Sequence, residues 1–190
     1  MYYYPIVEGY GEVDAVSILL RRISSEIGGT FADVPPPHRV KSSAFLQFGN
    51  EFYRSIQLGA EKAKVNNGIV VILLDCEDDC PATLGPKILA EAKRLRSDVN
   101  FEVFLAYREF ETWFIWAAES LAGEFGWPQS LVLLDNPESL RDAKGWIGKH
   151  LPQGYKETTH QKIFTAKFDL IAAQQSDSFQ RLVNCIKRYK

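Results

Sequence analysis

The sequence has little of the chemistry that marks secreted, zinc-binding or membrane proteins. It contains three cysteines and three histidines, and Cys76 and Cys80 lack the second cysteine pair or the nearby histidine of a zinc site. The odd cysteine count favours reduced thiols, which are typical of the cytoplasm. No apolar run approaches the roughly 18 residues that span a bilayer, and the first residues lack a signal-peptide pattern. We therefore expect a cytoplasmic protein without a membrane partner.

A strong net charge is also missing. The formal charge is −2, so the chain has no overall basic field, and any contact with nucleic acid needs a local basic patch. The composition, 46% hydrophobic and 24% charged, is typical of a folded protein and argues against disorder. No internal repeat or low-complexity linker divides the 190 residues, which suffice for one well-packed domain. We expect a single domain over residues 1–190.

Strands and helices alternate in the first part of the chain. Hydrophobic runs predict strands at about 2–8, 69–75 and 101–107, with helices at about 11–27, 50–66 and 83–97 between them. A further extended segment is expected near 39–48. This alternation predicts an α/β fold, with a mostly parallel central sheet of about four strands flanked by helices.

The pattern changes to helices alone in the last third of the chain. An aromatic-rich helix is predicted from Glu109 to about residue 123, with Trp113 and Trp116 interpreted as core residues in preference to base-stacking platforms. Further helices are predicted at 137–150, near 159–174 and at 176–189, the last capped by Ser176 or Asp177. We expect residues 124–190 to form a helical extension packed on an α/β core of residues 1–123.

Carboxylates follow the first two long strands. Glu8 ends the first strand, and Glu12 comes four positions later, across the turn Gly9-Tyr10-Gly11; Asp75 and Glu77 end the second. If these strands are neighbours in a parallel sheet, their four acids meet at one edge, where such sheets place ligands. Crowded carboxylates repel each other unless a cation holds them, and Mg²⁺ or Mn²⁺ prefers oxygen ligands. The sequence predicts a metal site of Glu8, Glu12, Asp75 and Glu77; the alternative is a set of solvated loop acids.

Four further residues are candidates to support the metal ligands or to bind phosphate: Asp79, Arg108, Glu109 and Glu111. Glu109 and Glu111 cannot both face the site if a helix begins at 109, because two helical positions lie about 200° apart. One of them could simply stabilise a helix N-terminus. Arg108 could bind phosphate or neutralise the acids. Lys156, in a basic-polar stretch, is the leading phosphate contact, with an ordinary surface lysine as the alternative.

The acidic motifs resemble those of the Toprim domain, found in topoisomerases, primases and OLD-family nucleases. The whole chain looks closest to an uncharacterised prokaryotic Toprim-like family, domain of unknown function 4276. The resemblance rests on five segments: Ile6-Val7-Glu8-Gly9 through Glu12, Leu73-Leu74-Asp75, Ala106 to Phe114, Tyr155-Lys156-Glu157, and Ser176 to Phe179. One departure is Asp75-Cys76-Glu77, where Toprim domains usually carry Asp-x-Asp, so Asp78 or Asp79 could replace Glu77 as a ligand.

The resemblance implies a three-layer Toprim-like fold and a Mg²⁺-dependent enzyme acting on phosphodiesters, most plausibly a nuclease of phage defence or DNA processing. Its catalytic residues would be Glu8, Asp75 and Lys156, and its partner nucleic acid, with DNA favoured over RNA. No Gly-x4-Gly-Lys-Ser/Thr motif is present, so an associated ATPase would be a separate protein. The rival hypothesis is a non-catalytic module that binds a partner protein or nucleic acid.

Overall fold

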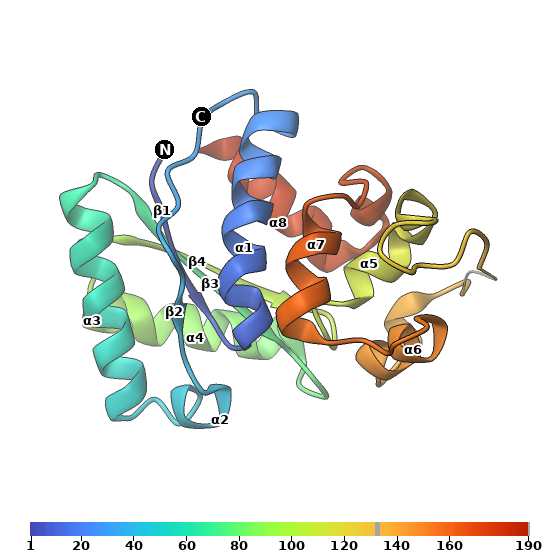
Figure 1. Cartoon of the computed structure of the whole chain (residues 1–190). Coiled ribbons are helices and arrows are strands. Elements are labelled where there is room, and N and C mark those ends of the chain that lie inside the picture. Colours follow the sequence, from blue (N-terminus) through green and yellow to red (C-terminus); the bar gives the residue numbers. More distant parts are fainter. Residues whose placement is uncertain (132–133, 190) are drawn as a thin grey trace.

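The centre of the molecule is a four-stranded, all-parallel sheet. The computed structural model describes residues 1–131 and 134–189. In chain order its strands are β1 (Tyr3–Val7), β2 (His38–Arg39), β3 (Ile69–Asp75) and β4 (Asn100–Ala106). They lie side by side in the order β2-β1-β3-β4 (Figure 1). The predicted α/β fold with a mostly parallel sheet of about four strands is confirmed.

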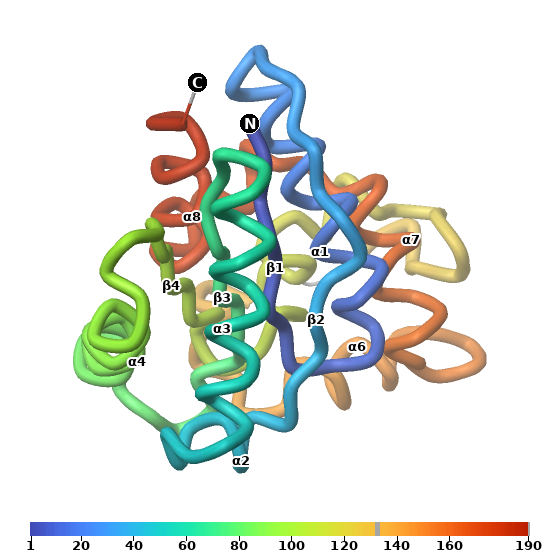
Figure 2. The backbone as a smooth tube through the Cα atoms, turned by 90° about the vertical axis from the view of Figure 1, so that its left-hand side faces the viewer, coloured from blue at the N-terminus to red at the C-terminus, as the bar shows by residue number. Residues whose placement is uncertain are grey.

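Helices cover both faces of the sheet, which makes three layers. Helices α1 (Tyr10–Arg22) and α8 (Asp177–Arg188) pack on one face, and α3 (Asn50–Val65) and α4 (Pro81–Leu95) on the other (Figures 1 and 2). Every residue of β1 and β3 is therefore buried. This explains why β3 is a continuous apolar run: strands buried on both sides need no polar face.

The first helix and the second strand differ from their predicted bounds. Helix α1 ends at Arg22 and continues as a π-helical turn, Ile23–Ile27, so the predicted helical stretch is present in two forms. The prediction of an extended segment near 39–48 is wrong beyond its first residue. The chain turns into the short helix α2 (Ser42–Phe45), in which the N–H groups of Ala44 and Phe45 donate to the Lys41 carbonyl and the Phe45 side chain is buried.

The predicted C-terminal helices are interrupted. Where one helix was predicted at 109–123, the structure has α5 (Thr112–Trp116) followed by the 3₁₀ turn Ala118–Leu121. Where one was predicted at 137–150, it has the 3₁₀ turn Pro137–Ser139 followed by α6 (Ala143–His150). The helix predicted near 159–174 is replaced by three short elements: a π-helical turn (Glu157–Gln161), α7 (Lys162–Thr165) and a 3₁₀ turn (Ala172–Gln175). Local side-chain caps cause two of these breaks. Asp142 accepts from the Gly145 N–H (2.7 Å) and Asp169 from the Ile171 N–H (2.6 Å).

The C-terminal segments share a hydrophobic core with α1 and the sheet. Five aromatic side chains at its centre have 0% exposure: Trp113, Phe114, Phe164, Phe168 and Phe179. They meet largely edge to face, with ring centroids 5.1 to 5.7 Å apart, an arrangement that the aromatic quadrupole favours. The interpretation of Trp113 as a core residue is confirmed. This packing carries α6 and the 155–161 segment round to the carboxyl edge of the sheet.

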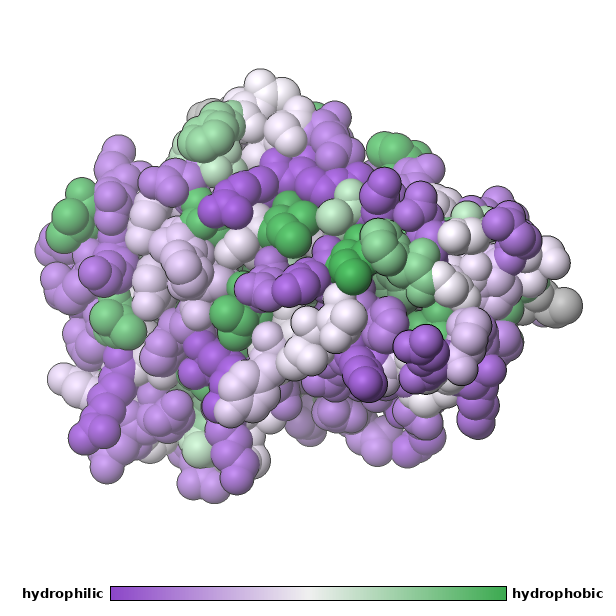
Figure 3. Space-filling model, in the orientation of Figure 1, coloured by the Kyte–Doolittle hydropathy of each residue, from purple (hydrophilic) through white to green (hydrophobic). Residues whose placement is uncertain are grey.

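Hydrophobic side chains are scattered on the face of the molecule that carries α1 and α7. Figure 3 shows them as separate patches among hydrophilic residues. In the part of the chain that the structure describes, no helix is long and apolar enough to cross a membrane.

Candidate functional site

Four carboxylates gather where β1 and β3 end. Parallel pairing of Val7 with Leu73 brings Glu8 and Asp75 out at the same edge of the sheet. Glu12, in the first turn of α1, and Glu111, just before α5, complete what we call the acidic cluster: Glu8, Glu12, Asp75 and Glu111. Glu12, Asp75 and Glu111 are only 3%, 7% and 0% exposed. Such burial is rare for carboxylates and is costly unless other groups compensate their charge.

Glu8 and Glu12 are held by the turn between them. One oxygen of Glu12 accepts hydrogen bonds from the backbone N–H groups of Glu8 (3.0 Å) and Gly9 (3.2 Å). These bonds tie Glu12 to the start of α1. The Ser42 hydroxyl donates to Glu8 Oε1 at 2.6 Å, whereas Glu8 Oε2 is buried and has no hydrogen-bond partner among the described residues.

Asp75 and Glu111 are also held by hydrogen bonds from neighbouring segments. Asp75 Oδ1 accepts from the Phe110 N–H at 2.7 Å. Glu111 Oε1 accepts from the Tyr155 hydroxyl (2.8 Å) and from Gln161 Nε2 (3.2 Å). Glu111 Oε2 is buried and, within the described residues, forms no hydrogen bond.

Lys144 is the cation beside these acids. Its ammonium lies 3.5 Å from Asp75 Oδ2, 4.0 Å from Glu111 Oε2 and 3.1 Å from Glu157 Oε1. Its backbone N–H, at the start of α6, donates to Glu109 Oε2 at 3.0 Å. The side chain is one-third exposed, so it reaches the cluster from the solvent side.

Burial dominates the proton equilibria of the cluster. It raises the pKa of Glu12 and of Glu111 to about 7. Burial, reinforced by the charges of Glu12 and Glu111, raises the pKa of Asp75 well above its usual value. Burial alone lowers the pKa of Lys144, but the nearby carboxylates outweigh it, and the net shift is upward. The cluster therefore favours either protons or added positive charge.

Gly11 allows the 157–161 segment to approach the cluster. A Cβ at this position would lie 2.7 Å from the Glu157 carbonyl oxygen and would overlap the Gln161 side chain. Only glycine leaves that space. The second glycine of the Gly-Tyr-Gly turn thus serves close packing, and it lets Gln161 reach Glu111.

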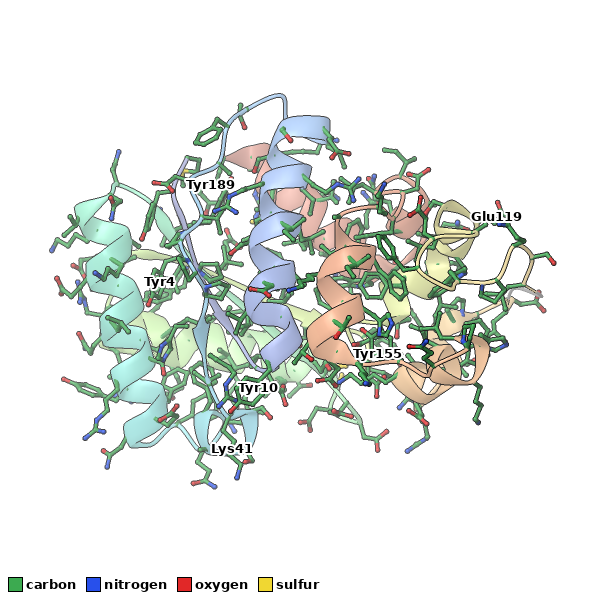
Figure 4. All side chains as sticks on the ribbon, viewed as in Figure 1. Tyr4, Tyr10, Lys41, Glu119, Tyr155 and Tyr189 are labelled. Atoms are coloured by element: carbon green, nitrogen blue, oxygen red, sulfur yellow. The ribbon has the colours of Figure 1, made fainter. Side chains whose placement is uncertain are left out.

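A cavity of about 490 Å³ opens beside the lysine and gives solvent access to it. Its lining residues are Lys144, Gly145, Gly148, Tyr155, Glu157 and Thr158. Figure 4 shows Tyr155 on the segment between α6 and α7, on the same lower side of the molecule as Tyr10 at the foot of α1. A ligand from solution would enter this side.

The loop after β3 places its acids differently from Asp75. Glu77 and Asp79 are exposed, and Glu77 has a left-handed backbone (φ 50°), as does Arg108 (φ 62°). Arg108 binds Asp78 at 2.8 Å, and Arg141 binds the same carboxylate at 3.0 Å. The structure thus brings Glu8, Glu12, Asp75 and Glu111 together, while Glu77 and Asp79 stand in the exposed loop outside them.

Lys156 lies at the rim of the site. Its neighbours Tyr155 and Glu157 direct their side chains to Glu111 and Lys144, respectively. The Lys156 side chain itself is exposed to solvent. Its role as a phosphate contact stays a prediction.

The carboxylates of the acidic cluster are the right kind of ligand for Mg²⁺ or Mn²⁺, but their present arrangement does not form a metal site. Carboxylate oxygens are the ligands these ions prefer, and two buried oxygens, one on Glu8 and one on Glu111, have no hydrogen-bond partner in the part of the chain that the structure describes. Yet among residues 1–131 and 134–189 no three His, Cys, Asp or Glu side chains converge closely enough to hold a metal ion. A divalent ion would therefore need the Lys144 ammonium and the carboxylates to shift.

The comparisons with known proteins give one result. A family model described as Domain of unknown function (DUF4276) matches residues 7–187. The chain belongs to this family. No match was found among curated proteins or among solved structures. The acidic cluster and Lys144 all lie inside the matched region, so the site is part of the DUF4276 domain.

Five residues that contact the acids of this DUF4276 site, or pair with Lys144, were not predicted to do so: Ser42, Lys144, Tyr155, Glu157 and Gln161. The one local signal was Asp142, a helix-capping residue that predicts a helix start and so places Lys144 in its first turn. Nothing in the sequence indicates that this turn packs against residues nearly 70 positions earlier.

The DUF4276 chain has a second and larger cavity, a groove of about 690 Å³ along the outer edge of β4. We call it the β4 groove. Its walls come from α4 and α8, and its charged lining includes Glu102, Arg181 and Arg188. Glu102 is paired with Arg188 (3.4 Å) and with the Tyr189 hydroxyl (2.8 Å).

Proposed function

We propose that this protein is a Mg²⁺- or Mn²⁺-dependent enzyme that hydrolyses phosphodiester bonds of nucleic acid. The observation that carries the proposal is a pair of buried carboxylate oxygens, Glu8 Oε2 and Glu111 Oε2, that have no hydrogen-bond partner among the described residues, in the same cluster as the buried Asp75. An unsatisfied buried oxygen costs about 1–3 kcal/mol, so two of them in one cluster call for a ligand.

The resemblance of the acidic motifs to Toprim domains supports the same chemistry. Glu8 at a strand end, Glu12 four residues later and Asp75 at the end of a neighbouring strand match that pattern in sequence and meet at one edge in space. The proposal extends to a nuclease role in DNA processing or phage defence, with DNA as the substrate and a separately encoded ATPase as a partner.

The residues that would hold the ion are Glu8 and Asp75, assisted by Glu12 and Glu111. When bound, a divalent cation lowers the pKa of water and stabilises the charge that develops on phosphate oxygens. Neighbouring residues hold the carboxylates in fixed positions. The Ser42 hydroxyl orients Glu8 through Oε1, and the Phe110 N–H orients Asp75 through Oδ1, while Asp75 Oδ2 is paired with Lys144.

Lys144 has two tasks in this proposal. With no ligand bound, its ammonium neutralises Asp75 and Glu111, which would otherwise repel each other. With substrate bound, its flexible, partly exposed side chain would swing to a phosphate oxygen, where a positive charge is worth more than in water because the site is buried. Lys156, Arg108 and Glu77 remain predicted contributors at the rim.

A second candidate function is a non-catalytic binding module. It is favoured by the same lysine, because Lys144 already supplies a positive charge and no three acids among the described residues converge on a metal position. In that case the cluster would only lock the C-terminal segments onto the sheet.

Asp75→Asn tests the enzyme hypothesis. The amide keeps an oxygen for the Phe110 N–H but binds divalent ions poorly, so Mn²⁺-dependent cleavage of plasmid and single-stranded DNA should fall by about 100-fold or more. Asp14→Asn, at an exposed position of α1, is the matched control and should keep full activity. Cleavage that persists in EDTA, or that survives Asp75→Asn, would contradict the proposal.

A further inference from the structure

An exposed aromatic side chain stands next to the acidic cluster. Tyr10 is the first residue of α1, two positions after Glu8, and it is 67% exposed. The guanidinium of Arg39, at the end of β2, lies 4.0 Å from the centre of its ring. Figure 4 places Tyr10 at the foot of α1, on the side where Lys41 also lies. A large aromatic ring this exposed contributes little to the core.

Arg39 holds this ring in place from one side only. It reaches the Glu8 carbonyl oxygen at 3.5 Å, and β2 pairing fixes its backbone opposite Val7. A guanidinium stacked on a tyrosine ring is a cation–π contact, which orients both planar groups. Because most of the Tyr10 surface is open, a second planar group has room to stack on the ring.

The charges around the ring are positive, in contrast to the cluster beside it. Arg39 and Lys41 are exposed, and neither forms an ion pair with a described residue. In the cluster, Glu12, Asp75 and Glu111 are buried, and Lys144 faces Asp75 and Glu111, which reduces their repulsion of an approaching phosphate. Glu8 is half-buried and is held by the Ser42 hydroxyl. An aromatic ring flanked by cations is the usual means of binding unpaired nucleotides.

We propose that Tyr10 and Arg39 form a stacking platform for an unpaired nucleobase, with Lys41 beside it to contact the flanking backbone phosphate. The ligand class is single-stranded nucleic acid, because a base inside a duplex is already stacked on its neighbours. This inference rests on the proposed function, since it assigns the substrate of the same site. The platform would place the phosphodiester next to the stacked base within reach of Glu8.

The test measures binding of fluorescein-labelled 12-nucleotide DNA by fluorescence anisotropy, in EDTA to prevent metal-dependent cleavage. Three probes are used: a single strand, its duplex, and an abasic strand of the same length and charge. The wild-type chain should bind the single strand about tenfold more tightly than the abasic strand, which lies within the range that one stacked base contributes. It should also prefer the single strand over the duplex.

Four variants test which residues cause the preference for bases. Tyr10→Ala should lose the preference for bases, and Tyr10→Trp should keep it. Arg39→Ala should weaken binding of all three probes and reduce the preference for bases. Phe31→Ala is the matched control, because Phe31 is 81% exposed but lies in the loop between the end of α1 and β2, away from the carboxyl edge; it should behave as wild type.

Equal affinity of the wild type for the single strand and the abasic strand would overturn the platform. So would an equal loss of the preference for bases in Tyr10→Ala and in Phe31→Ala. Mn²⁺ stabilisation, measured on the same preparations, reports the proposed function separately. Mn²⁺ binding without base preference would contradict only the platform. Base preference without Mn²⁺ binding would contradict only the metal-dependent enzyme.

Discussion

The β4 groove and the acidic cluster differ in how their charges are compensated. In the groove, the larger cavity, Glu102 is 23% exposed and bonded to Arg188 and Tyr189. In the cluster, Glu111 is fully buried and shares the Lys144 ammonium with Asp75, and its Oε2 has no hydrogen bond from any described residue. The difference teaches that cavity volume and uncompensated buried charge do not coincide in this protein: the larger cavity is the groove, whereas the less completely compensated carboxylates lie in the cluster. Arg188 and Tyr189, which bind Glu102, correspond to Lys144 and Tyr155, which contact Glu111, so variants of the two regions can be compared in pairs.

The largest effect on stability is expected from Lys144→Met. It removes the cation that faces three carboxylates, so the free energy of unfolding at pH 8 in EDTA should fall by about 2 to 4 kcal/mol. Arg188→Met, which breaks the exposed pair with Glu102, should cost no more than about 1 kcal/mol. Urea denaturation measures both. Equal losses would show that the cluster is no more sensitive to charge than the groove.

The pH dependence of stability should reflect the raised carboxylate pKa values. Glu12 and Glu111 have pKa values of about 7 in the folded chain against 4.5 as the ordinary value. The folded state then binds more protons than the unfolded state between these limits, so this contribution is full below about pH 4.5 and is lost as the pH rises through about 7. Glu111→Gln should flatten the dependence of the melting temperature on pH in this range. An unchanged slope in Glu111→Gln would contradict the assigned shift.

A smaller effect is expected from the two tyrosine hydroxyls that donate to glutamates at the same distance, 2.8 Å. Tyr155→Phe removes a bond to the buried Glu111 and should cost about 1 to 3 kcal/mol. Tyr189→Phe removes a bond to the more exposed Glu102, which water can replace, and should cost less than about 1 kcal/mol. Thermal unfolding at pH 8 compares the two. A larger loss in Tyr189→Phe would reverse the order of the two regions.

The sheet could be predicted from sequence because β1 and β3 are continuous apolar runs that end in acids. The same local signal identified Glu8, Glu12 and Asp75, since parallel strands bring their carboxyl ends to one edge. The sequence also gave Glu111 as a candidate site residue. The helix was predicted to start at Glu109, but it starts at Thr112, and Glu109 accepts a hydrogen bond from the Lys144 N–H.

The rest depends on tertiary packing that no local pattern encodes. Lys144 reaches Asp75 only because the aromatic core around Trp113 carries α6 to the sheet edge. Glu77 was predicted to join Asp75 at the edge of the sheet. The backbone is left-handed at Glu77, whose N–H donates to the Arg108 carbonyl, and Glu77 lies in the exposed loop.

The most direct test of the central claim is the melting temperature of the full chain with and without millimolar Mn²⁺. Binding at 100 times the dissociation constant adds about 2.7 kcal/mol, which corresponds to several degrees for a chain of this size. We expect Mn²⁺ to raise the melting temperature of the wild type and of Glu102→Gln, the groove control, and to have little effect on Glu8→Gln, whose amide can still accept from Ser42. No Mn²⁺ shift in the wild type, or an equal shift in Glu8→Gln, would contradict the assignment of the acidic cluster as a cation site.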